Sequence, residues 1–169
     1  DEPAQAQAAL DQAIKKLQES GVRRQETENK SAVGGDPNGV AANQALGELL
    51  LFRAECHAAA GRPAAADADL AAAKPLAPPV VSHKAAARVY RSKPDLAAAG
   101  AHFLEVARLD PLSADAHRTL TALLAATDGR AAARTHLGQA CQKFPHHHPL
   151  LKMRAEFLSG DPDADADRA

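Results

Sequence analysis

Apolar and small residues recur along this chain at the three-to-four-residue spacing of amphipathic helices, and turn residues interrupt them at intervals. The clearest example runs from Ala114 to Pro145, where two such stretches are separated by Asp128-Gly129. Leu120 lies on the apolar face of the first stretch, and Ala133 and Leu137 lie on that of the second. This segment therefore predicts two helices joined by a tight turn.

The N-terminal part of the chain predicts a longer hairpin. Leu10, Ile14 and Leu17 are spaced for one face of a helix that we expect over residues 1–31. The Asp36-Pro37 pair provides a capping residue followed by a first-turn proline, so we expect a second helix from there to Ala60. A loop at 32–36 would join them.

Three segments share one spacing of anchor residues. In each segment the first anchor precedes an alanine by the same number of positions, and a proline follows that alanine at a fixed distance. The prolines recur at an interval of about 34 residues, which indicates an internal repeat. The anchors are Leu50, Arg53, Ala54, His57, Ala66, Leu70 and Pro78; then His83, Ala86, Ala87, Tyr90, Ala99, Phe103 and Pro111; then His117, Leu120, Thr121, Leu124, Ala133, Leu137 and Pro145.

This pattern resembles the tetratricopeptide repeat, a helix-turn-helix unit of about the same length, over roughly residues 47–158. Small anchors let the paired helices approach closely, larger ones fill the remaining groove, and the proline ends the second helix. The chain departs from the family pattern because no segment has the usual Trp, and Leu46-Gly47 stands out of register. Arg53 and Thr121 also occupy positions that are normally apolar or small. We therefore interpret the chain as a degenerate member of this family.

The resulting domain prediction is a single all-α helical array over residues 1–160. Its repeats cover about 47–79, 80–113 and 114–147, and a capping helix over 148–159 follows them. Residues 161–169 contain no apolar anchor, so we expect a disordered acidic tail there.

Composition agrees with the all-α class and narrows the possible partners. The chain is 46% hydrophobic but only 3% aromatic with no Trp, which favours closely packed helices over a sheet. Its formal net charge is −1, so nothing global attracts nucleic acid. No apolar run approaches the ~20 residues that span a bilayer, so we expect no membrane insertion. The expected location is the cytoplasm, or the periplasm after signal-peptide removal.

Neither the cysteines nor the histidines predict a catalytic or metal site. Cys56 and Cys141 lie on repeats that are not neighbours, so we expect free thiols that fill packing positions. His146, His147 and His148 are consecutive, so their side chains point in different directions and cannot all face one ion. The sequence also contains no phosphate-binding loop and no hydrolase or metalloprotease motif. We predict no enzyme activity, no metal and no cofactor.

The family resemblance implies that the first helix of each hairpin lines a concave surface where a partner peptide or helix lies. Projecting those helices by their own periodicity places eight candidate partner-binding residues on that surface: Glu48, Leu51, Glu55, Lys84, Arg88, Arg91, Arg118 and Lys152. Lys84, Arg88 and Arg91 form one basic stripe on their helix, and Arg118 and Lys152 would continue it. A stripe of this kind suits the carboxylates of an acidic partner segment.

The predicted function is therefore that of a scaffold or adaptor that binds another protein. Three alternatives stay open at this stage. The charged face could be solvated without any ligand. The alanine-rich inner helices could instead form an apolar groove that carries a lipid-like molecule; this groove would be lined by Leu51, Ala58, Ala59, Ala122, Ala125 and Ala126. Because the chain begins without Met, it could also be one module of a larger protein.

Overall fold

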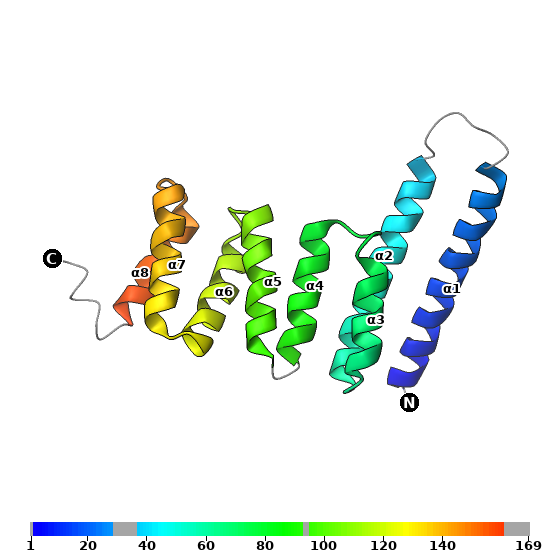
Figure 1. The fold of residues 1–169 in the computed structure, drawn as a ribbon, viewed down its shortest axis with the longest axis horizontal. Helices are drawn as coiled ribbons and strands as arrows, with labels where there is room; N and C mark the ends of the chain where they lie inside the picture. Colours follow the sequence, from blue (N-terminus) through cyan, green and yellow to red (C-terminus); the bar gives the residue numbers. More distant parts are fainter. Residues whose placement is uncertain (1, 29–36, 93–94, 161–169) are drawn as a thin grey trace. The chain divides into compact units, whose positions relative to one another are not determined.

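The computed structural model describes residues 2–28, 37–92 and 95–160 (Figure 1). Most of these residues are helical and none is in a strand, which confirms the all-α prediction. In chain order, the helices found in the described ranges are α1 (Glu2–Glu28), α2 (Pro37–Ala59), α3 (Pro63–Ala73), α4 (Pro79–Ser92), α5 (Leu96–Leu109), α6 (Ala114–Thr127), α7 (Arg130–Lys143) and α8 (His148–Ser159). The loop predicted at 32–36 and the tail predicted at 161–169 lie outside the described residues.

The chain divides into two compact units, Asp1–Pro94 and Asp95–Ala169. The boundary falls inside the predicted repeat 80–113, so α4 belongs to the first unit and α5 to the second. Each unit is described by itself below. The single continuous array over residues 1–160 therefore stays a prediction.

In the first unit, α2 is the central helix and packs against α1, α3 and α4. Its core consists of Ile14, Leu50, Leu51, Ala73, Ala77 and Ala85. Gly47 lies where α2 meets the connection between α3 and α4. A Cβ atom added there would lie 2.8 Å from the backbone nitrogen of Ala77 and 2.9 Å from the Cβ of Leu76. The glycine of the out-of-register Leu46-Gly47 pair therefore permits this close approach.

Arg53, which departs from the repeat pattern, ties three helices of the first unit together. Its guanidinium group donates two hydrogen bonds to Asp69, from Nε to Oδ2 at 2.8 Å and from Nη2 to Oδ1 at 2.7 Å. A third bond runs from Nη1 to Oδ1 of Asp11, at 2.9 Å. Asp69 is only 6% exposed, and its hydrogen bonds raise the pKa of Arg53 above its usual value. An ion pair thus replaces the apolar contact expected between α2 and α3, and it also holds α1.

In the second unit, each helix from α5 to α8 packs against the next, and α6 also contacts α8. The predicted anchors Leu120, Ala133 and Leu137 are all buried. The predicted break at Asp128-Gly129 is confirmed, because α6 ends at Thr127 and α7 begins at Arg130. The predicted capping helix over 148–159 is α8.

Gly129 has φ +89° and ψ 167°, a conformation that essentially only glycine adopts. Thr121, the other departure from the repeat pattern, is buried on α6, and its hydroxyl donates a hydrogen bond of 2.7 Å to the carbonyl of His117.

Among the described helices, none has both the length and the apolar character that crossing a membrane requires.

Candidate binding surfaces

The eight predicted surface residues divide between the two units. Arg118 and Lys152 lie in the second unit, and the other six lie in the first. The basic stripe predicted to continue from α4 to α6 therefore stays a prediction, and each surface is analysed within its own unit.

The structure corrects the placement of Leu51. Its side chain is 3% exposed and belongs to the core around Ile14 and Leu50, so a partner at the surface does not reach it. The cause is tertiary packing, because α1, α3 and α4 all pack against α2 and contribute Ile14, Ala73 and the buried Ala85 to this core. Phe52 is 57% exposed instead. The sequence signal for Phe52 was a large apolar residue that is not among the repeat anchors.

A polar hollow of about 400 Å³ in the first unit contains three of the predicted residues, Glu55, Arg88 and Arg91. Arg88 donates to Oε1 of Glu55 from Nη2 at 2.6 Å and from Nε at 3.0 Å, joining α4 to α2. The predicted acidic and basic candidates are therefore partners of each other, and the charge of the basic stripe is partly neutralised. Lys84 is partly buried on the same helix, and Glu48 accepts a hydrogen bond of 3.0 Å from Gln44.

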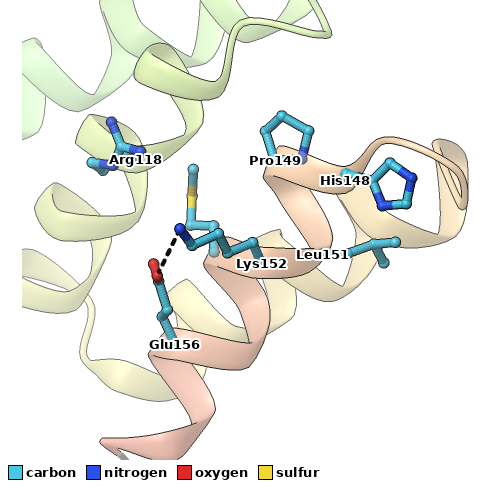
Figure 2. A pocket seen from close by; sticks show the side chains of 7 residues that line it. Arg118, His148, Pro149, Leu151, Lys152 and Glu156 are labelled. Atoms are coloured by element: carbon cyan, nitrogen blue, oxygen red, sulfur yellow. Dashed lines mark ion pairs between the residues drawn. The ribbon is translucent and has the colours of Figure 1, made fainter.

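The second unit places Arg118 and Lys152 around one hollow of about 620 Å³ (Figure 2). Arg118 comes from α6 and Lys152 comes from α8, and the two positions are separated by one length of the predicted repeat. Both helices pack against α7 and also touch each other, and this arrangement brings the two cations to the same hollow. The sequence-based projection of the helices had assigned both residues to one surface, and both line this hollow.

The cations of this hollow are accessible and only loosely paired. The side chain of Lys152 is 78% exposed and its Nζ lies 3.8 Å from Oε1 of Glu156, as Figure 2 shows. The side chain of Arg118 is 69% exposed and its Nη1 lies 4.0 Å from Oδ1 of Asp115. Exposed pairs of this kind contribute about 0.2–1 kcal/mol each. Either cation can therefore turn to a ligand at small cost.

The same hollow has an apolar component. Pro149, Leu151 and the buried Met153 line it together with the cations. In Figure 2 the side chain of Leu151 points away from Lys152. A hollow that combines a few polar groups with apolar lining is typical of a binding site.

The histidines and cysteines show no arrangement that points to a metal. Among the described residues, no group of three or more His, Cys, Asp or Glu side chains could hold an ion. Cys56 and Cys141 are free thiols, and burial raises the pKa of Cys141. The sequence did not reveal that His117, a repeat anchor, lies beside His136 on the next helix.

The structure does not bring together all the residues that we expected to line an apolar groove. Leu51 is in the core, and Ala59 lines the polar hollow of Arg88 and Arg91. Ala122 and Ala126 are exposed on α6, in the other unit. Within the first unit, Ala59 therefore lies at the hollow that holds the ion pair of Arg88 and Glu55.

No protein-family model matches this chain, and no curated protein sequence is significantly similar to it. The resemblance to the tetratricopeptide repeat accordingly rests on the spacing of the anchor residues.

Proposed function

We propose that this chain is a non-enzymatic interaction module that binds an acidic segment of a partner protein in the hollow between α6 and α8. The observation that supports the proposal most strongly is the convergence of Arg118 and Lys152 from helices one repeat apart. Both side chains are accessible, and both have only weak pairing with nearby carboxylates.

The chemistry of the hollow favours carboxylates as ligands. Guanidinium and ammonium groups make charge-assisted hydrogen bonds to carboxylates, and a ligand that reaches both cations replaces their two long ion pairs. The apolar lining from Pro149, Leu151 and Met153 would accept an aliphatic side chain next to the acidic one. The preferred segment is therefore acidic with at least one adjacent apolar residue.

The proposal also assigns the chain to tetratricopeptide-type repeat proteins. Support comes from the repeated anchor spacing, from helix bounds that follow it, and from the burial of Ala66, Ala99 and Ala133, one small anchor in each repeat. In such an array α2, α4, α6 and α8 would be the first helices of their hairpins.

Binding of an acidic ligand in the hollow of the first unit would cost more free energy. Arg88 would have to exchange its short contacts with Glu55 for contacts with a ligand. Arg91 lines the same hollow and takes no part in the two hydrogen bonds between Arg88 and Glu55. We therefore expect Arg91 to contribute more to partner binding than Arg88.

The test begins with the selection of peptides that bind the immobilised full chain from a random display library. Selected peptides are then titrated by calorimetry against Lys152→Glu and Arg118→Glu. The matched control is Arg154→Glu, which makes the same change of charge on α8 but lines a different hollow. We expect each hollow variant to weaken binding about tenfold, since losing a charge-assisted contact costs about 1.5 kcal/mol.

Two results would overturn the proposal. If the selected peptides are not enriched in Asp or Glu, the argument that the two cations attract an acidic segment fails. Equal weakening by Lys152→Glu and Arg154→Glu would show that net charge, rather than this hollow, determines binding.

A further inference from the structure

A second hollow of the same unit has a different chemistry from the one between α6 and α8. It has a volume of about 380 Å³ and lies between α5, α7 and the turn that leads into α6. Its apolar wall comes from Leu104, Ala107, Ala140 and Phe144. Leu104 is 55% exposed, so a large apolar side chain stands at this hollow without being covered. An apolar ligand group would bury it.

A pair of histidines forms a polar edge of this hollow. Nδ1 of His117 lies 3.0 Å from Nε2 of His136, and Nε2 of His117 lies 3.1 Å from the carbonyl oxygen of Pro111. A carbonyl oxygen can only accept, so Nε2 of His117 carries a hydrogen. In the neutral ring Nδ1 is then an acceptor, and His136 must donate from its own Nε2. The network therefore fixes the tautomers of both rings.

This arrangement determines how the pair takes up protons. His136 can take up a proton on its own Nδ1, and the hydrogen bond that its Nε2 donates to Nδ1 of His117 is then kept. A second proton would place two N–H groups opposite each other. Burial and the neighbouring His117 lower the pKa of His136 to about 4. An anion beside His136 would supply the opposite charge that the imidazolium form needs.

The charged groups at the hollow favour an anionic ligand. Those that face the histidine pair are Glu105 and Arg108 from α5 and Lys143 from α7. Arg108 and Glu105 pair with each other at 2.8 Å, so their charges offset. Nζ of Lys143 lies 5.5 Å from the centre of the Phe144 ring, at the apolar wall itself. Lys143 therefore gives the lining of this hollow a net positive charge.

We infer that this hollow is a second binding site, for a carboxylate carried on a small apolar body. The apolar body lies against Leu104, Ala107, Ala140 and Phe144. The carboxylate lies at the polar edge and accepts a hydrogen bond from Nδ1 of the protonated His136 ring. Two sources carry this chemistry: a free aliphatic acid, and the C-terminal residue of a peptide. The site is separate from the hollow between α6 and α8, and it does not depend on the function proposed for that hollow.

The test uses the full chain and sodium hexanoate, with hexanamide as the uncharged analogue. The resonance of the His136 ring is followed by NMR against pH, with and without each compound. We expect saturating hexanoate to raise the pKa of His136 by about one unit, since an opposite charge within 4–6 Å shifts a pKa by about 1–3 units. Hexanamide should leave that pKa unchanged.

Three variants separate the two parts of the site. His136→Gln retains an N–H donor for Nδ1 of His117 but should weaken hexanoate binding, and only the pH dependence that comes from the carboxyl group of hexanoate should remain. Leu104→Ser changes an exposed side chain, so the fold is expected to survive, and hexanoate affinity should fall severalfold. Leu151→Ser removes another exposed leucine, one that lines the hollow of Lys152, and should have no effect.

The source of the carboxylate is identified by competition. A peptide that ends in leucine with a free carboxylate is added to the hexanoate complex. Displacement of hexanoate identifies the C-terminus of a peptide as the ligand, and no displacement identifies the free aliphatic acid. The amidated peptide serves as its control. The inference fails if the pKa of His136 is the same with and without hexanoate. It also fails if hexanamide binds as tightly as hexanoate, or if Leu104→Ser binds hexanoate as tightly as the parent protein.

Discussion

Gly47→Ala is predicted to destabilise the first unit, although alanine is the better helix former. The new Cβ would lie 2.8 Å from the backbone nitrogen of Ala77, 2.9 Å from Cβ of Leu76 and 3.0 Å from its carbonyl carbon. Two of these atoms are backbone, so a side-chain rotation cannot relieve the overlap. Helix α2 or the connection between α3 and α4 must move instead.

The expected magnitude combines two opposing effects. Inserting a methyl group into tight packing costs about 1–3 kcal/mol. Replacing glycine by alanine within a helix contributes about 0.5–1 kcal/mol of stability. The net result should be a loss of about 1–2 kcal/mol in the free energy of unfolding.

Gly138→Ala is the matched control. Gly138 lies within α7, and a Cβ there has no atom of another group within 4 Å. Only the gain in helix stability remains, so this variant should be more stable than the parent by about 0.5–1 kcal/mol. Urea denaturation followed by circular dichroism measures both variants, and hydrogen exchange locates the loss of protection to α2, α3 and α4. The reasoning is refuted if Gly47→Ala is as stable as the parent or more stable.

Three further predictions concern other contacts. Asp69→Ala should lower the free energy of unfolding by about 2–3 kcal/mol in urea denaturation, because the partly buried guanidinium of Arg53 loses two of its three hydrogen bonds. An Arg53→Met change that restores the stability of Asp69→Ala would support this cause, and a loss under about 1 kcal/mol would contradict it. His136 has a folded-state pKa of about 4 against 6.5 when unfolded, so the unfolded chain binds more protons between these values. The second unit should therefore lose about 1–2 kcal/mol as the pH falls from 6.5 to 4, after allowance for solvent screening, and His136→Gln should lack this loss in thermal unfolding. Gly129→Ala should cost about 1–3 kcal/mol, because its φ of +89° with ψ 167° suits only glycine, and an unchanged melting temperature would refute this.

Local signals in the sequence predicted the all-α class and the ends of several helices. Asp128-Gly129 marked the turn between α6 and α7, and the repeat spacing brought Arg118 and Lys152 to one hollow. These features depend on residues that are close in sequence or related by one repeat, so periodicity determines them.

Contacts that join several helices could not be predicted in this way. The sequence projection assigned Leu51 to the surface because it could not show that α1, α3 and α4 all pack against α2. Arg53 looked like a defect of the repeat until its partners Asp69 and Asp11 were known. The pairing of His117 with His136 depends on the orientation of two side chains, which no spacing rule specifies.

The most direct test of the proposed function is a double-mutant cycle between Lys152 and an acidic residue of a selected peptide. Lys152→Glu and an acidic-to-lysine change in the peptide are measured singly and together by calorimetry. If α8 contacts the peptide through Lys152, the double change should restore affinity, with a coupling energy of about 1 kcal/mol or more. Additive losses for every acidic position of the peptide would contradict the assignment of the hollow between α6 and α8 as the partner-binding site.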